Sequence, residues 1–314
     1  MTESTTGPSG GAGVELIAAL LPRCGFAPDD RPVVCAVSGG ADSLALLVLA
    51  AAAHDDVTAV HVDHGLRPGG DAEAEVVRLA AERFGASFRS VRVEVGAGPN
   101  LEARARAARY AVLPEGACTG HTADDQAETV LLQVLRGAGL DGLAAMRPGE
   151  RRPIVRLRRS ETRALCAALD LRPVDDPSNR DPAHRRNRVR HELLPLLADV
   201  AGRDVVPLLA RLADHARDAT DHLSAESAAI DPTDAGALAA APPTLARVAV
   251  RAWLRTCSPE RHPPDAATVE RVLAVARLDA VATDVGRGWR VARTAGRLRL
   301  VEPRETTERS VDLG

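Results

Sequence analysis

Between residues 32 and 136, short apolar runs alternate with amphipathic stretches. Buried strands are predicted for the apolar runs at 32–37, 57–62, 88–95 and 117–120. Helical periodicity of the apolar positions predicts helices at 42–53, 71–84, 100–113 and 123–136. This alternation is typical of an α/β fold, a doubly wound, mostly parallel sheet with helices on both faces. Ligands of such sheets bind beyond the carboxyl ends of the strands.

Beyond residue 136 the pattern becomes mostly helical. Residues 137–152 are loop-like, and an apolar run at 154–157 is compatible with one more strand. Helices are predicted for residues 160–169, 187–200, 205–229, 235–255 and 266–276, with a turn-rich segment at 173–182. The last apolar alternation, at 282–301, predicts a β-hairpin that turns at 294–296.

These elements suggest four parts. We expect a flexible tail and first helix at 1–22, a catalytic α/β domain at 23–204, a connector helix at 205–232 and a small C-terminal α+β domain at 233–314. The first residues are polar, without the basic and apolar regions of a signal peptide. No apolar stretch reaches 18 residues, so we expect a cytoplasmic protein without membrane contact.

Composition removes several classes of enzyme. The chain contains no lysine, so all 40 basic residues are arginine, which a GC-rich genome would also produce. A Walker A loop and a Schiff-base enzyme both need a lysine and are therefore excluded. The five cysteines are far apart, which disfavours a zinc ribbon, an iron–sulfur cluster or a redox pair.

A glycine-rich turn lies between the first predicted strand and the first predicted helix. Its sequence is Ser38-Gly39-Gly40-Ala41-Asp42-Ser43. Glycines permit close backbone approach, and the N–H groups and dipole of the helix favour an anion. Asp42 would repel a phosphate unless Mg²⁺ bridges the two, so we predict Asp42 as a metal ligand; the alternative is a simple helix cap.

A second polar constellation follows the fourth predicted strand. We predict catalytic roles there for His121, Asp124, Asp125 and Glu128, alongside Asp42. Asp124 and Glu128 are four residues apart and would share a helix face. Thr122 and Asp125 also have the spacing of a capping box, so helix capping is the competing interpretation.

The pattern resembles the PP-loop family of N-type ATP pyrophosphatases and, within it, the tRNA(Ile)-lysidine synthetases. Besides the glycine turn, the likeness is carried by His61-Val62-Asp63-His64-Gly65-Leu66-Arg67, by Thr119-Gly120-His121-Thr122-Ala123-Asp124-Asp125-Gln126-Ala127-Glu128-Thr129, and by Asp176-Pro177-Ser178-Asn179 with Arg186-Asn187-Arg188-Val189-Arg190. The chain departs from the family at His184, where an aromatic residue is expected.

The resemblance implies a two-step ligation that uses ATP and Mg²⁺. ATP adenylates the wobble cytidine of the CAU anticodon of tRNA(Ile), and free L-lysine then displaces AMP. ATP would be bound by the glycine turn together with Val62, Asp63 and His64. A homodimer is left open.

Two arginine-rich segments stand out in a chain of net charge −3. Residues 151–190 hold 12 arginines against five acids, and residues 285–304 hold six against one. Such islands suggest focused phosphate-binding surfaces, with a solvated arginine face as the alternative. Contacts with tRNA are predicted for Arg104, Arg109, Arg186, Arg188, Arg190, Arg290, Arg293 and Arg297.

Two competing functions remain at this stage. A PP-loop tRNA thiolase would share the glycine turn but often carries cysteine pairs, whereas the cysteines here are scattered. A nucleotide-binding module without catalysis, in turn, would need neither the acidic constellation nor the arginine islands.

Overall fold

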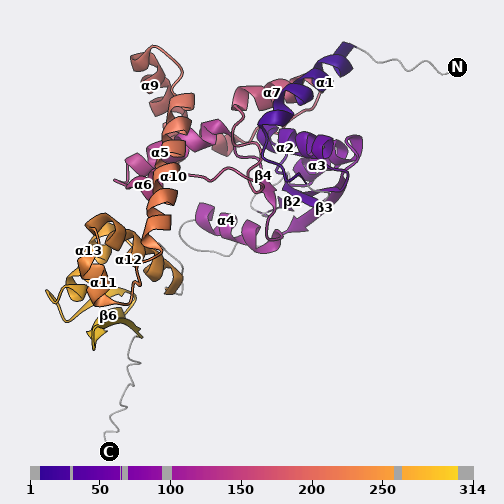
Figure 1. The fold of residues 1–314 in the computed structure, drawn as a ribbon. Helices are drawn as coiled ribbons and strands as arrows, with labels where there is room; N and C mark the ends of the chain where they lie inside the picture. The colour runs from indigo at the N-terminus through magenta and orange to yellow at the C-terminus, as the bar shows by residue number, and fades with distance from the viewer. Residues whose placement is uncertain are drawn as a thin grey trace, which may run out of the picture. The chain divides into compact units, whose positions relative to one another are not determined.

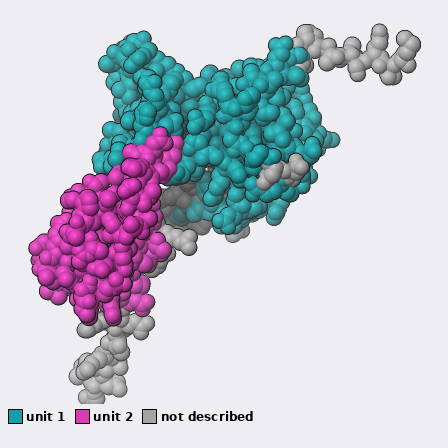
Figure 2. Space-filling model, in the orientation of Figure 1, with its two compact units in different colours: residues 1–216 teal, residues 217–314 magenta. Residues whose placement is uncertain are grey.

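The computed structural model describes residues 8–28, 31–63, 65, 70–93, 101–257 and 264–302, with only the backbone of residues 8–10, 101–103, 105, 106 and 109. The chain divides into two compact units, Met1–Ala216 and Arg217–Gly314 (Figure 2). The division falls inside helix α10 (Val206–Ser227), within the segment for which a connector helix is predicted. Among the described residues, no helix combines the length and apolar character needed to cross a bilayer.

The first unit is built on a parallel sheet, which confirms the predicted fold class (Figure 1). Its four strands run in the order β3-β2-β1-β4. They are β1 (Val33–Ala36), β2 (Val57–Asp63), β3 (Ser87–Arg92) and β4 (Cys118–Thr119). All three pairings are parallel, and β1 lies between β2 and β4. The glycine-rich turn at 38–43 therefore leaves an inner strand of the sheet.

Helices connect the strands and cover the sheet. They are α1 (Pro8–Leu20), α2 (Ala41–Ala53), α3 (Gly70–Arg83), α4 (Leu101–Val112), α5 (Ala123–Val134), α6 (Leu140–Leu143) and α7 (Arg159–Ala168). Short 3₁₀ turns lie at Leu21–Arg23 and Pro177–Arg180. The predicted helix at 187–200 is instead α8 (Arg185–Arg188), a π-helical segment (Val189–Leu193) and α9 (Leu194–Ala201).

Helix α2 is the centre of the hydrophobic core. Leu44, Leu46, Leu47 and Leu49 are fully buried, although they point in different directions around the helix axis. A helix that is apolar all round must be covered all round, here by the sheet, α1, α3 and α7. The glycine-rich turn is thus attached to a helix with eight buried residues.

The apolar run at 154–157 is not a strand. Ile154 and Leu157 are fully buried, but the segment runs as turns in which the Leu157 N–H donates to the Ile154 carbonyl at 2.9 Å. Burial alone produced the apolar pattern there. All five cysteines lie within the described residues, and none forms a disulfide.

The second unit packs helices against an antiparallel sheet. The helices are α11 (Ala235–Ala240), α12 (Pro243–Cys257) and α13 (Ala266–Ala276). The single helix predicted at 235–255 is interrupted because Pro242 and Pro243 cannot continue a helix. The predicted hairpin is formed by β6 (Trp289–Thr294) and β7 (Arg297–Val301), and a third strand, β5 (Ala282–Gly286), precedes it.

Candidate functional site: a phosphate loop beside an acidic helix

The turn from β1 into α2 has the geometry of a phosphate loop. Gly39 adopts a φ of 84°, in the left-handed region that other residues avoid. Its carbonyl accepts a hydrogen bond from the Val174 N–H at 3.0 Å. The Ser43 hydroxyl donates to the Gly40 carbonyl at 2.9 Å and accepts from the Ser38 N–H at 3.1 Å, which closes the loop. Ala41 and Asp42 begin α2, so their N–H groups have no carbonyl in a preceding helical turn, as anion binding requires.

Asp42 lies in the first turn of α2 with its side chain 23% exposed. Its two carboxylate oxygens accept separate hydrogen bonds, from the Thr162 hydroxyl at 2.5 Å and from Arg159 Nε at 3.3 Å. Burial raises the pKa of Asp42, and the bonds from Thr162 and Arg159 oppose that rise. The carboxylate is therefore held in one orientation by α7.

The turn from β4 into α5 lies directly against this loop. A Cβ atom added to Gly120 would lie 2.8 Å from the Asp42 carbonyl oxygen, a distance that real Cβ atoms do not reach. Only glycine allows the two segments to approach so closely. His121 follows at once, with Nδ1 2.8 Å from the Thr119 hydroxyl. The structure thus brings together the phosphate loop and the predicted His121 constellation.

The predicted capping box at the start of α5 is confirmed. The Asp125 carboxylate accepts hydrogen bonds from the N–H and the hydroxyl of Thr122, both at 2.9 Å. The other Asp125 oxygen faces arginines, so the residue both caps the helix and forms ion pairs. Capping and charge pairing are therefore not alternatives at this position.

Arginines surround the two most buried carboxylates. The Glu128 side chain has no exposed surface and contacts Arg159 at 3.1 Å, Arg186 at 2.7 Å and Arg190 at 2.7 Å. Asp125, 11% exposed, contacts the same arginines at 2.9, 3.0 and 3.5 Å. Charges as buried as these persist only when they are paired and hydrogen-bonded. Both carboxylates are neutralised within the protein.

Asp124 has different partners from Glu128, although the two residues are four positions apart on α5. It accepts hydrogen bonds from Arg158 Nε at 3.1 Å and from the Arg159 N–H at 2.8 Å. Asp125, three residues before Glu128, is instead the one that shares its arginines. Burial pushes the pKa of Asp124 and Asp125 upward, but the arginines outweigh it, so the pKa of both is lowered.

Three contributors to the site were not predicted. Arg158 and Arg159 at the start of α7 contact four acidic groups of the constellation, and Thr162 one turn later holds Asp42. No local pattern signals these roles, because the partners are distant in sequence. A separate feature is the buried His61, which is 2% exposed. Its Nδ1 lies 3.0 Å from the carbonyl of Val37, the residue just before the phosphate loop.

The other predicted nucleotide and RNA contacts are only partly described. Val62 and Asp63 end strand β2, and Asp63 accepts a hydrogen bond from the Gly65 N–H at 2.8 Å, whereas His64 lies outside the described residues. Arg104 is partly buried on α4, and the Arg109 side chain is outside the described part. Arg188 pairs with Glu192 at 2.9 Å on the surface.

The three predicted arginines of the second unit differ from one another. Arg290 is exposed and makes no ion pair with any described residue. Arg297 pairs with Asp231 at 2.8 Å. Arg293 donates to the Ala276 carbonyl at 2.6 Å, at the end of α13, so it satisfies a helix C-terminus.

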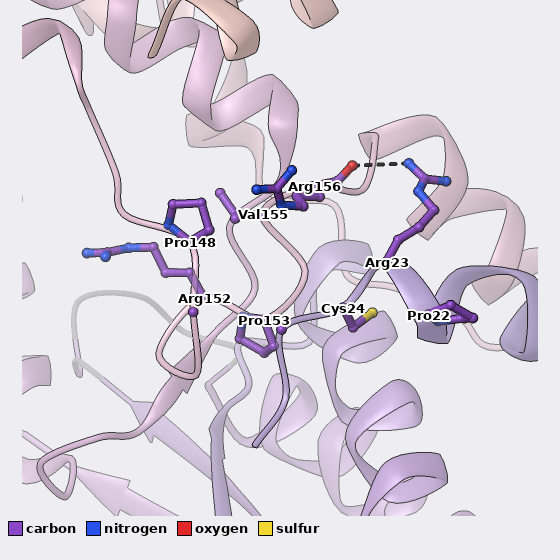
Figure 3. Close-up of a pocket in the computed structure, with 10 residues that line it drawn as sticks. Pro22, Arg23, Cys24, Pro148, Arg152, Pro153, Val155 and Arg156 are labelled. Carbon is purple, nitrogen blue, oxygen red and sulfur yellow. Dashed lines mark hydrogen bonds between the residues drawn. The ribbon is translucent and has the colours of Figure 1, made fainter. Parts of the chain in front are cut away.

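The described part of the site contains no metal cluster. Within the described residues, no group of three or more His, Cys, Asp or Glu side chains could hold a metal ion by itself. Asp42 therefore offers one carboxylate, and phosphate oxygens would complete a Mg²⁺ shell. A separate pocket of about 190 Å³ is lined by residues from segments 22–25 and 148–156. Arg23 there donates a hydrogen bond to the Arg156 carbonyl (Figure 3).

Comparison with known proteins agrees with this geometry. The family model of the PP-loop domain matches residues 17–197. A tRNA(Ile)-lysidine synthase of Nocardia farcinica is 48% identical over 244 residues, covering 72% of this chain and 77% of that protein. One from Salinispora tropica is 40% identical over 311 residues, covering 88% and 92%.

The chain belongs to the tRNA(Ile)-lysidine synthase family. Members of this family are enzymes, so the arrangement described above is a candidate active site. Among solved structures, a U34-tRNA thiolase from Methanococcus maripaludis is similar with a TM-score of 0.49 and 17% identity, over 64% of this chain and 80% of that one.

Proposed function

We propose that this enzyme joins free L-lysine to C2 of the wobble cytidine in the CAU anticodon of tRNA(Ile). ATP would adenylate the C2 oxygen with release of pyrophosphate, and the lysine amine would then displace AMP. The observation that carries the proposal is the contact at Gly120, which brings a phosphate loop against the start of an acidic helix in a chain of this family. The chemistry needs these two parts side by side.

The phosphate loop supports the first step. Its N–H groups and the α2 dipole would hold the triphosphate, and Asp42 would hold Mg²⁺ against it. When bound, the metal would offset the charge that develops on the phosphate oxygens. Asp42 suits this role because its carboxylate is oriented by Thr162 and Arg159 while 23% of the side chain remains exposed.

The second step needs a proton acceptor near the lysine amine. The unperturbed pKa of such an amine is about 10.4, so it must lose a proton before it attacks. We assign this role to His121, because the Thr119 hydroxyl lies 2.8 Å from Nδ1 and holds the imidazole ring in the turn that leads into α5. Asp124, 17% exposed, is the better candidate for a direct contact with lysine, whereas Asp125 and Glu128 act through the arginines that they hold.

The second unit offers a surface for the tRNA backbone. The strand register places Arg290, Arg297 and Arg299 on one face of the β5–β7 sheet, because Arg290 pairs with Val301, Ala292 with Arg299 and Thr294 with Arg297. All three arginines are exposed. Val291 and Leu298 face the hydrophobic core on the other side. We therefore add Arg299 to the predicted contacts and assign Arg293 a structural role.

Lysine-dependent AMP formation tests the proposal. Purified protein is incubated with ATP, Mg²⁺, lysine and a tRNA(Ile) transcript carrying CAU, and AMP and base mass are measured. AMP and a lysine-sized mass increase should appear only when lysine and RNA are both present, and a transcript with U at the wobble position should remain unmodified. Thiolation with a sulfur donor would favour the thiolase alternative, and ATP binding without AMP would favour a non-catalytic module.

A further inference from the structure

Arg159 is the only described side chain that joins the phosphate loop to the acidic helix through ion pairs with both. It contacts Asp42 of α2 at 3.3 Å, Asp125 of α5 at 2.9 Å and Glu128 of α5 at 3.1 Å. A different nitrogen makes each contact, Nε with Asp42 and the two terminal nitrogens with α5. The side chain is only 15% exposed. The guanidinium therefore bridges two segments that meet at the candidate active site.

The surroundings hold this guanidinium in place. Arg159 begins α7, and its own N–H donates to Asp124 at 2.8 Å. Thr162, one turn along the same helix and fully buried, binds the other oxygen of Asp42. Arg186 and Arg190 share Asp125 and Glu128, so those carboxylates would remain paired without Arg159. Asp42, in contrast, pairs with no second arginine within the described residues.

A planar guanidinium suits this bridge better than any other cation. Its five N–H donors form a rigid fork, whereas an ammonium group is a compact point charge on a flexible stem. Nε and the terminal nitrogens diverge, so one arginine can reach carboxylates on two sides. A lysine at the same position could pair with α5 or with Asp42, but its single nitrogen could not reproduce all three separate contacts.

We propose that Arg159 is a positioning residue that fixes Asp42 of the phosphate loop relative to the acidic start of α5. In this role it sets the distance between the phosphate loop, where adenylation would occur, and the start of α5, where lysine would bind. This inference rests on the function proposed above. It acts through Asp42, Asp125 and Glu128 rather than by touching the substrates. Its loss should therefore impair turnover more than ATP binding.

Steady-state kinetics of Arg159→Ala provide the first test. We expect kcat to fall ~100-fold, since misplacement of about 1 Å costs that much. The KM for ATP should change less than about threefold, because the loop N–H groups remain in place. Arg163→Ala is the matched control, as Arg163 lies one turn later on α7 and is exposed. It should retain wild-type kinetics.

Chemical rescue separates positioning from a general loss of stability. Adding guanidinium at about 20 mM to Arg159→Ala should restore kcat at least fivefold, while the same concentration of methylammonium should not, because only guanidinium offers divergent N–H donors. Equal effects of the two cations would overturn the inference. If Arg159→Ala does not fold, Arg159→Lys decides the question, since wild-type kcat in that variant would equally overturn it.

Arg159→Lys also provides a readout that is independent of activity. The natural chain has no lysine, so this substitution introduces the single side-chain amine. An amine reagent should modify it at least ~10-fold more slowly than the amine of Arg163→Lys, because a buried, ion-paired amine stays protonated and covered. Equal labelling rates would contradict the buried bridge. Inactivity of the wild type would instead count against the proposed function.

Discussion

Arginines serve different purposes in the two units. In the first unit, Arg159, Arg186 and Arg190 lie partly or largely buried around Asp125 and Glu128, and each bonds more than one carboxylate. In the second unit, Arg290 and Arg299 are exposed on the solvent face of a sheet. The first group completes an internal charge network, and only the second is available to a phosphate backbone. A count of arginines along the chain does not distinguish the two situations.

Many arginines of the island at 151–190 are paired within the protein and are not free to bind phosphate. At least six of its 12 arginines form ion pairs, namely Arg158, Arg159, Arg180, Arg186, Arg188 and Arg190. Much of the local positive charge is therefore neutralised by carboxylates, some of them outside the island. The predicted RNA contacts of Arg186 and Arg190 would require these pairs to rearrange, whereas that of the exposed Arg290 in the second unit would not.

The largest effect is expected from breaking the buried network. Glu128→Ala would leave three arginines without their fully buried partner, which should lower the free energy of unfolding by about 3–5 kcal/mol. Thermal or urea unfolding of the variant measures the loss. The control is Glu192→Ala, which removes one exposed pair with Arg188 and should leave the midpoint nearly unchanged. Similar losses of unfolding free energy in both variants would show that the buried network stabilises the fold no more than an exposed ion pair does.

Asp42→Asn should separate catalysis from stability. The amide keeps the size of the side chain but removes the charge proposed to hold Mg²⁺. We expect AMP formation to fall at least ~100-fold with an almost unchanged unfolding midpoint, because developing charge on phosphate would lose its counterion. Turnover at saturating Mg²⁺ is the measurement. Full activity would remove Asp42 from the metal site.

The exposed arginines should affect RNA binding in a salt-dependent manner. Arg290→Ala combined with Arg299→Ala should weaken tRNA binding by about tenfold and reduce the slope of log affinity against log salt by about 2. ATP affinity should not change. Arg293→Ala is the matched control, because it should destabilise the second unit at the end of α13 and leave the salt slope intact. A change in slope for Arg293→Ala would reverse our assignment.

The smallest effect concerns pH. The pKa of Asp125 is lowered in the folded protein, so the carboxylate stabilises the fold above its usual value of 3.8 and loses that contribution as the pH falls through the lowered pKa. The unfolding midpoint should therefore decline below about pH 4. Asp125→Asn should show a flatter decline over the same range. Parallel curves for the two proteins would assign acid sensitivity to other carboxylates.

Local sequence patterns predicted much of the fold. The phosphate loop was predictable because strand, glycines and helix follow one another, and the capping box because Thr122 and Asp125 are three residues apart. The role of Arg159 was not, since its partners Asp42 and Asp125 come from other elements. The buried run containing Ile154 illustrates another limit, because burial without regular structure gives the same pattern as a short strand.

The close approach at Gly120 has a consequence for the order of events. Since the Asp42 carbonyl oxygen lies only 2.8 Å from where a Cβ atom of residue 120 would be, we expect motions of the phosphate loop and of the His121 turn to be coupled. A nucleotide that rigidifies the loop would also restrain the His121 turn. Part of the entropic cost of ordering that turn would then be met before the amino acid binds. We therefore expect amino-acid affinity to rise once nucleotide is bound.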